Sequence, residues 1–182
     1  MGQKTILLIT DGIGFNASDK FNAFANAKKP AYDYLFKNVP NTLLRTSGLA
    51  VGLPQGQMGN SEVGHMTIGS GRILYQNLVK IDRAIDEGSL EKNEALQSLL
   101  SKCRRVHVIG LYSDGGVHSH LRHFDAICEI AQNAGCETWA HAITDGRDVS
   151  PSSGVEFLKH LQAKFKVASV CGRFYAMDRD KR

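Results

Sequence analysis

A glycine-rich run places Ser61 where a nucleophile could work. The run extends from Gly56 to Arg72, holds five glycines, and leads into a segment that could form a helix. Glycine allows close backbone approach and positive φ angles, and a serine at a helix N-terminus faces unpaired N–H donors that hold a phosphoryl oxygen. We therefore predict that Ser61 is a nucleophile in phosphoryl transfer, although glycine-rich runs also serve as ordinary connections.

Two further residues, Asp11 and His65, suit the same site. Asp11 directly follows the apolar run from Lys4 to Thr10. That run predicts a strand buried in a parallel sheet, and α/β folds bind ligands at the carboxyl ends of such strands. Asp11 thus stands at a ligand-binding position, but a carboxylate there can also cap the next turn. His65 could orient Ser61, and a purely structural hydrogen bond is the alternative.

Side chains that bind phosphate and exchange protons follow the expected strands of the later region, in loops 113–120, 144–149 and 172–180. Arginine suits phosphate or carboxylate bidentately, histidine can donate to phosphate, and aspartate can accept from a sugar-like hydroxyl. Because loops after parallel strands open on one sheet edge, they predict a pocket for a small phosphorylated acid with free hydroxyls. The residues selected for this pocket are His118, Arg147, Asp148, Arg173 and Arg179.

The other acidic residues and histidines near these loops have structural interpretations. Asp114 and Asp145 precede glycines, which is typical of turns. His120, His123 and His160 fall on expected helices, so we assign them to helix surfaces or helix packing.

A regular alternation of helices and strands from residue 75 onward predicts the parallel sheet that carries these loops. The expected strands are 106–111, 137–141 and 167–171. The expected helices are one with Leu78, Ile81 and Ile85 on one face, one over 118–133 that stops at Gly135, and one opened by Pro151 with Val155, Leu158, Leu161 and Phe165 facing the core.

The expected order of helices and strands is different in the first region. After the strand at 4–10 we expect a helix around 31–36, a short strand around 42–46 and then the glycine-rich loop. The glycines and the change in the pattern of elements predict a boundary near 69–75, with a hinge between the two regions. We therefore predict an α/β protein with domains 1–74 and 75–182.

Composition limits the possible function classes. The 182 residues are 42% hydrophobic with a formal charge of +4, which indicates a soluble globular protein. No apolar run approaches the roughly 20 residues that span a bilayer, and the N-terminus lacks a signal-peptide pattern, so we expect a cytoplasmic protein. No basic block suggests nucleic acid, and a small anionic substrate fits better. The four cysteines form neither a zinc pattern nor a disulfide scaffold.

Taken together, five blocks resemble the cofactor-independent phosphoglycerate mutase family, and the resemblance spans the chain. The blocks are Asp11-Gly12, Gly-Gln-Met-Gly-Asn-Ser-Glu-Val-Gly-His at 56–65, Ser-Asp-Gly-Gly-Val-His-Ser-His at 113–120, Asp-Gly-Arg-Asp-Val at 145–149 and Gly-Arg-Phe-Tyr-Ala-Met-Asp-Arg-Asp at 172–180. Several of them are long and specific to that family.

The resemblance implies a function, a fold and roles for named residues. It implies interconversion of 3-phosphoglycerate and 2-phosphoglycerate through a phosphoserine, with two divalent metal ions, most often manganese. It also implies an alkaline-phosphatase-like domain into which an α/β transferase domain with a mostly parallel sheet is inserted. By motif, Ser61 is the nucleophile and a metal ligand, and Asp11 is a ligand in the same metal site. The five residues selected above match substrate-binding positions. We expect the full-length protein to be a monomer.

This chain departs from that family in length. Family members continue well beyond the position of Arg182, and their remaining metal ligands and a further pair of substrate-binding arginines lie there. We therefore expect the 182 residues alone to be inactive, and residues 1–74 to be poorly protected or to self-associate.

Two other functions stay open at this point. One is a phosphatase or phosphopentomutase-like enzyme of the alkaline phosphatase superfamily. The other is a module that binds a phosphorylated acid without reaction.

Overall fold

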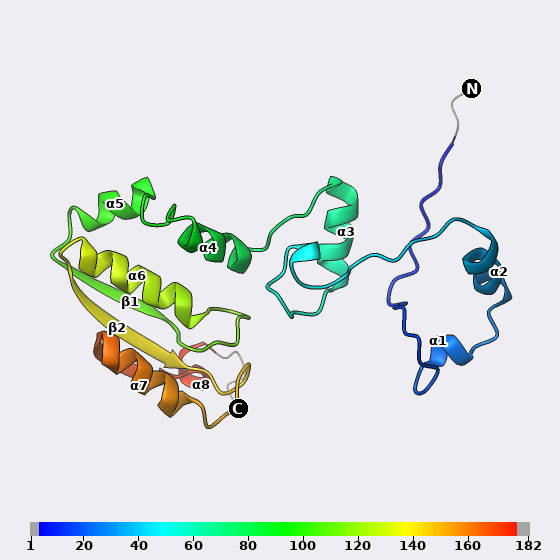
Figure 1. Cartoon of the computed structure of the whole chain (residues 1–182). Coiled ribbons are helices and arrows are strands. Elements are labelled where there is room, and N and C mark those ends of the chain that lie inside the picture. Colours follow the sequence, from blue (N-terminus) through cyan, green and yellow to red (C-terminus); the bar gives the residue numbers. More distant parts are fainter. Residues whose placement is uncertain (1–3, 178–182) are drawn as a thin grey trace.

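Three parallel strands form the sheet of the protein, in the order β1-β2-β3. The computed structural model describes residues 4–177 (Figure 1). The strands are β1 (Arg105–Leu111), β2 (Glu137–Thr144) and β3 (Lys166–Gly172), close to the expected ranges. Parallel neighbours need crossover connections, and helices supply both of them. The predicted α/β class and the parallel sheet are confirmed.

The crossover helices are α6 (Leu121–Asn133) and α7 (Gly154–Lys164). Each begins three residues later than expected. The His120 side chain caps α6 by accepting a hydrogen bond from the Arg122 N–H at 3.1 Å, which fixes the start of that helix. Residues 151–153 form a turn ahead of α7. Gly135 follows α6 with a φ of 81°, in agreement with its predicted role as the stop.

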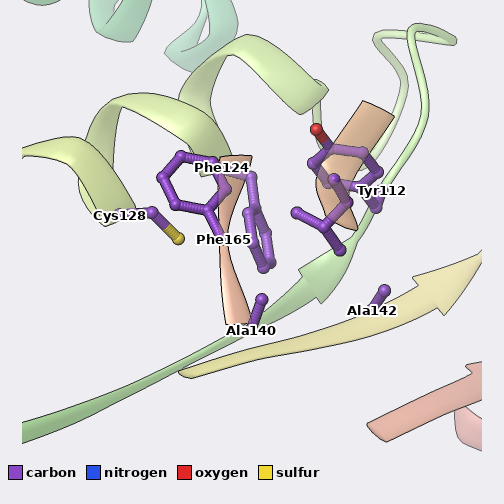
Figure 2. Packing of buried hydrophobic residues seen from close by; sticks show 7 residues of the cluster. Tyr112, Phe124, Cys128, Ala140, Ala142 and Phe165 are labelled. Carbon is purple, nitrogen blue, oxygen red and sulfur yellow. The ribbon is translucent and has the colours of Figure 1, made fainter. Parts of the chain in front are cut away.

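The core lies between the sheet and these two helices. Its buried residues are Tyr112, Phe124, Cys128, Ala140, Ala142, Leu161 and Phe165, most of which Figure 2 shows. The two β2 alanines are two positions apart and therefore point to the same face of the sheet, so α6 and α7 cover one face together. Leu158 packs against this core, and Leu161 and Phe165 lie in it, as expected. The prediction for Val155 is wrong, because this side chain in the first turn of α7 is 61% exposed.

A buried carboxylate, Asp125 on α6, links three elements of this core. Tyr112, just after β1, donates its hydroxyl to Asp125 Oδ1 at 2.7 Å. From α7, Lys164 Nζ donates to Oδ2 at 2.8 Å and His160 Nε2 lies 3.2 Å from the same oxygen. Burial, and then the bond to Asp125, raises the pKa of Tyr112, so the hydroxyl stays protonated and donates. His160 thus packs between helices, as predicted.

An Asp125→Ala variant tests this link. It would leave the buried Tyr112 hydroxyl without its acceptor and remove a charge partner of Lys164. We expect the free energy of unfolding to fall by about 2–4 kcal/mol, because each buried donor left unsatisfied costs about 1–3 kcal/mol. Urea unfolding followed by circular dichroism measures the loss. Glu129→Ala is the control: Glu129 lies 3.7 Å from Lys164 but its side chain is 55% exposed, and an exposed pair contributes about 0–1 kcal/mol. Equal losses in the two variants would contradict the assignment.

Two helices come directly before β1, α4 (Asn77–Asp86) and α5 (Glu94–Leu100). Asp82 on α4 holds α6 through His123 Nε2 at 2.9 Å and Arg122 at 3.3 Å. His123 is therefore a packing residue, as predicted. The apolar face expected for α4 is partly wrong, since Val79 is its buried residue and Ile81 is 37% exposed.

Residues 4–76 form short helices and no strand. They are α1 (Ala23–Asn26), α2 (Pro30–Asn38), the 3-10 helix η1 (Gly48–Val51) and α3 (Ser61–Ser70). The predicted strands at 4–10 and 42–46 are absent, and Ile6 and Leu8 are 91% and 81% exposed. A strand needs a hydrogen-bonding neighbour, and all three strands of residues 4–177 lie within 105–172. In the same described part, no helix is long and apolar enough to cross a membrane.

Hydrogen exchange provides a direct test of this arrangement in the 182-residue chain. Amides of residues 4–10 are expected to exchange at rates near those of an unfolded peptide. Amides of the central strand β2 should exchange at least about 10³-fold more slowly, because they open only with the sheet. Mass spectrometry after peptic digestion resolves both segments. Strong protection of residues 4–10 in a monomeric sample would contradict the prediction, whereas protection that grows with concentration would indicate self-association.

Candidate functional site

Ser61 occupies the first position of α3, where the sequence placed a helix start. Asn60 caps the helix, and its side chain accepts a hydrogen bond from the Val63 N–H at 3.1 Å. The Ser61 side chain is exposed. The first N–H groups of a helix have no partner inside the helix and carry its positive dipole end. The hydroxyl therefore stands at a position where a phosphoryl group would meet backbone donors.

Close packing of the preceding loop fixes where α3 begins. Gly48 N–H donates to the Gln57 carbonyl at 2.9 Å. A Cβ at Gly59 would lie 1.8 Å from the Thr46 carbonyl oxygen, so only glycine fits there. The loop is thus held against residues 46–48 two positions before Ser61. Behind it, Val51, Leu53 and Val63 form a small buried cluster.

His65 contacts Ser61 twice through a single ring nitrogen. Its Nδ1 lies 2.7 Å from the Ser61 carbonyl oxygen and 3.0 Å from the Ser61 Oγ. A carbonyl oxygen can only accept, so Nδ1 carries a proton and donates it to that oxygen. In this arrangement the imidazole Nδ1 cannot also accept from the hydroxyl. His65 therefore holds Ser61 in place, which favours the structural role over that of a base.

Asp11 lies near Ser61 although the strand expected before it does not form. The Ser61 hydroxyl, ahead of the Gly12 backbone N–H, lowers the pKa of the Asp11 carboxyl. The Gly12 N–H donates to Asp11 Oδ1 at 2.9 Å. Asp11 is therefore an ionised, exposed carboxylate at neutral pH, placed beside the serine hydroxyl.

Asp11 and Ser61 together present oxygen atoms that suit a hard divalent ion such as Mn²⁺. Among residues 4–177, no group of three or more His, Cys, Asp or Glu side chains is placed to hold a metal ion. The described residues thus fit part of a metal site and do not complete one.

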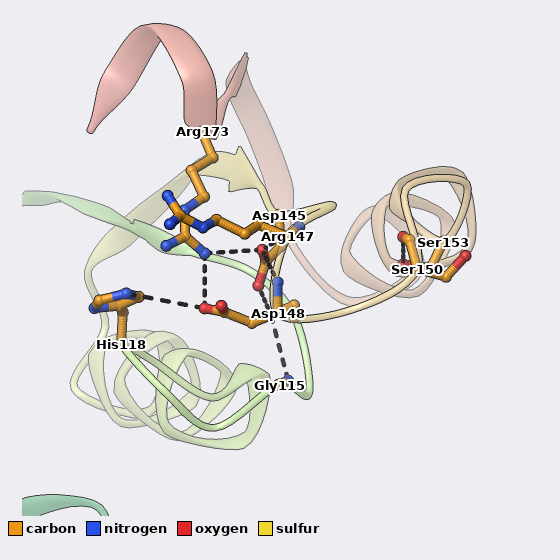
Figure 3. Close-up of polar contacts among 9 residues, drawn as sticks. Gly115, His118, Asp145, Arg147, Asp148, Ser150, Ser153 and Arg173 are labelled. Carbon is orange, nitrogen blue, oxygen red and sulfur yellow. Dashed lines mark hydrogen bonds and ion pairs between the residues drawn. The ribbon is translucent and has the colours of Figure 1, made fainter. Parts of the chain in front are cut away.

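A second group of selected residues meets at the carboxyl edge of the sheet (Figure 3). Arg173 opens the short helix α8 (Arg173–Ala176), and its Nη1 lies 2.7 Å from Asp148 Oδ2. His118 Nε2 lies 3.9 Å from the same oxygen. Asp148 therefore connects the loops after β1 and β3. Arg147, from the same loop, is exposed, and Arg179 lies outside the described residues.

The two groups stand apart in the molecule. In Figure 1, α3 lies away from α8 and the carboxyl edge of the sheet, and α4 follows the connection between the two regions. The structure thus brings Asp11 to Ser61, and His118 to Asp148 and Arg173, as separate clusters. A reaction that uses both clusters would require that the substrate moves from one to the other or that the two parts of the protein close on each other.

Known proteins match this chain over its whole length. The family described as "BPG-independent PGAM N-terminus" matches residues 81–182, more than half of the chain. The chain belongs to this family of BPG-independent phosphoglycerate mutases. The 2,3-bisphosphoglycerate-independent phosphoglycerate mutase of Campylobacter jejuni strain RM1221 is 67% identical over 187 aligned positions, and that of Sulfurimonas denitrificans is 58% identical over 186.

A solved structure of the family agrees with the fold. Phosphoglycerate mutase from Leishmania mexicana, crystallised at low cobalt concentration, superposes with a TM-score of 0.62 at 35% identity, over 85% of this chain and 31% of that one. The curated mutases match all of this chain, which spans 38% of their length.

Two further residues belong to the sheet-edge cluster of His118, Asp148 and Arg173 in this mutase-family chain but lie outside the set predicted from the sequence. The side chains of Ser113 and Asp145 are buried there and bonded to each other, with Ser113 Oγ donating to Asp145 Oδ2 at 2.8 Å. The sequence predicts only a turn role for Asp145. The available signal was position, because Asp145 directly follows β2, as Arg173 follows β3, and Ser113 lies two positions after β1. Nearby, a Cβ at Gly115 would lie 3.1 Å from Asp148 Cβ, so this glycine lets the two loops touch.

Proposed function

We propose that this chain is the N-terminal part of a mutase that interconverts 3-phosphoglycerate and 2-phosphoglycerate through a phosphoserine at Ser61. The observation that carries the proposal is the exposed Ser61 hydroxyl at the first position of α3, beside the ionised Asp11. The names of the curated relatives support phosphoglycerate as the substrate and the independence from 2,3-bisphosphoglycerate. The reaction belongs to glycolysis and gluconeogenesis, and we assign the parent protein to the cytoplasm as a monomer.

In the first half of the reaction, Ser61 Oγ attacks the phosphorus of the bound phosphoglycerate. A bond forms from Oγ to phosphorus, the bond from phosphorus to the glycerate oxygen breaks, and that oxygen takes up one proton while Oγ gives one up, so the step has no net proton change. The N–H groups at the start of α3 stabilise the transferring phosphoryl group. His65 keeps Ser61 in place through its donation to the Ser61 carbonyl. In the second half, the other glycerate hydroxyl takes the phosphoryl group back.

Two divalent ions, Mn²⁺ as the family resemblance implies, are part of this proposal, with Asp11 and Ser61 as ligands of one of them. Such ions lower the pKa of a bound hydroxyl and neutralise charge on the phosphoryl group. The structural relative was crystallised at low cobalt concentration, which supports a divalent-metal requirement. The remaining ligands would come from the part of the parent protein outside these 182 residues.

The sheet-edge cluster is the proposed binding site for the glycerate during transfer. Arg147, Arg173 and Arg179 would pair with its carboxylate or phosphate, and His118 and Asp148 would bond its polar groups. Holding the glycerate in this way makes phosphoryl return effectively intramolecular and excludes water. We also propose that residues 1–74 and 75–182 belong to different domains, the first carrying Ser61 and the second this cluster.

An activity assay on the full-length protein tests the proposal. With Mn²⁺ and without bisphosphoglycerate, it is expected to convert 3-phosphoglycerate into 2-phosphoglycerate, which phosphorus NMR resolves. Release of inorganic phosphate instead of isomerisation would identify a phosphatase. Calorimetric binding of phosphoglycerate without turnover would identify a binding module, and either result would overturn the mutase assignment.

A further inference from the structure

Asp145 accepts hydrogen bonds from four donors. Its Oδ1 accepts from the backbone N–H groups of Arg147 and Asp148, each at 3.0 Å, and from Arg173 Nη1 at 3.1 Å. Its Oδ2 accepts from Ser113 Oγ at 2.8 Å. Burial alone would raise the pKa of this carboxyl, but these four donors together lower it, so the group is ionised at neutral pH.

These donors come from all three loops at the carboxyl edge of the sheet. Ser113 follows β1 by two positions, Arg147 and Asp148 follow β2, and Arg173 follows β3 directly. Parallel strands bring their carboxyl ends to one edge, which is why a single carboxylate can reach all three loops. The Ser113 loop leads on to His118, whose Nε2 lies 3.9 Å from Asp148 Oδ2.

Burial separates Asp145 from the residues that could touch a substrate. Its side chain is 1% exposed, whereas the Asp148 side chain is 16% exposed and that of His118 is 49% exposed. A carboxylate that is covered by protein and surrounded by donors fixes the groups that bond to it. Asp145 Oδ1 pairs with Arg173 Nη1 at 3.1 Å, and Asp148 Oδ2 pairs with the same nitrogen at 2.7 Å.

We infer that Asp145 is a positioning residue, which fixes His118, Arg147, Asp148 and Arg173 relative to one another by bonding the three loops that carry them. This inference rests on the proposed function, because it assumes that those four residues bind the phosphoglycerate. Asp145 itself does not contact the substrate.

Two substitutions at this position in the full-length protein separate hydrogen bonding from volume. Asp145→Asn keeps an oxygen for the three Oδ1 donors, and its Nδ2 can donate to Ser113 Oγ, which can also accept. Asp145→Ala removes every one of these bonds. We expect the alanine variant to raise KM for 3-phosphoglycerate about 10-fold or more, with a smaller fall in kcat, and the asparagine variant to stay within about threefold of wild type. Glu156→Gln, an exposed carboxylate at the start of α7, is the control and should change neither constant.

A double variant asks whether Asp145 acts through Arg173. If it does, Asp145→Ala should raise KM by a smaller factor in an Arg173→Ala protein than in wild type, because one of the four groups to be positioned is already gone. Independent, additive effects would overturn the inference, as would an unchanged KM in a folded Asp145→Ala protein or an asparagine variant as impaired as the alanine one. If Asp145→Ala fails to fold, Ser113→Ala decides, since it removes the single Oδ2 donor. It should then raise KM several-fold, and an unchanged KM would overturn the inference.

The same experiments keep this inference distinct from the proposed function. Wild-type protein that isomerises phosphoglycerate supports the proposed function, whatever the Asp145 variants do. If wild type binds 3-phosphoglycerate in calorimetry without isomerising it, the mutase proposal fails and the inference is judged by the change in Kd instead. Wild-type protein that neither binds nor isomerises it overturns both.

Discussion

A Ser61→Ala variant of the full-length protein is expected to lose phosphoglycerate interconversion by at least about 10³-fold, because it removes the atom that takes the phosphoryl group. The exposed hydroxyl stands at the first position of α3, and alanine there leaves the Asn60 cap and the helix intact. The fold should therefore survive the change. Phosphorus NMR of 3-phosphoglycerate incubated with the variant and Mn²⁺ measures the loss, and circular dichroism checks the fold.

Ser70→Ala is the matched control, since it makes the same change at the other end of the same helix. Ser70 Oγ donates to the Arg72 carbonyl at 2.8 Å and has no place in the proposed chemistry. Its activity should stay within about twofold of wild type, as for most surface substitutions. In addition, acid quenching of wild type during turnover should yield a peptide phosphorylated at Ser61. A Ser61→Ala protein that retains a tenth or more of wild-type activity would rule out the phosphoserine route.

The 182 residues by themselves are expected to show no turnover, a loss of at least about 10³-fold against the full-length protein. Asp11 and Ser61 supply oxygen ligands, but no set of three or more metal-binding side chains comes together within residues 4–177. Without its ions the serine hydroxyl is a weak nucleophile. The assay is the same NMR measurement on the purified 182-residue polypeptide, with Mn²⁺ present.

One outcome would contradict this second expectation. Turnover by the 182-residue polypeptide that disappears in its Ser61→Ala variant would show that the chain needs no further ligands. Turnover that persists in that variant would instead come from a contaminating mutase. Isothermal calorimetry with 3-phosphoglycerate is a useful companion, because it tests whether the sheet-edge cluster binds substrate without the reaction.

Parts of the site that depend on neighbours in the chain could be predicted. Asn60 before Ser61 is a cap signal, and α3 begins where that signal lies. The alternation of helices and strands after residue 75 predicted a parallel sheet. Parallel strands bring the loops of His118, Asp148 and Arg173 to one edge of that sheet. Only the assignment of those residues to phosphoglycerate depended on the family resemblance.

Tertiary structure decided the features that depend on partners distant in the chain. The run from Lys4 to Thr10 has the apolar character of a buried strand, yet it forms none here, because a strand needs a neighbour and the described chain supplies none beside it. Val155 has helical spacing with Leu158, but its place at the open start of α7 leaves it exposed.

Asp145 shows most clearly which features follow from the sequence and which depend on the tertiary structure. An aspartate before a glycine predicts a turn, and Asp145 does accept hydrogen bonds from two backbone N–H groups of that turn. Its bonds to Ser113 and Arg173 join residues 32 and 28 positions away. Sequence by itself thus determined the three strands of the sheet, the start of α3 and the family, which follow from local backbone preferences and recurring motifs. Only the folded sheet decided which carboxylate holds the three loops, because that depends on distances between chain segments that no local pattern encodes.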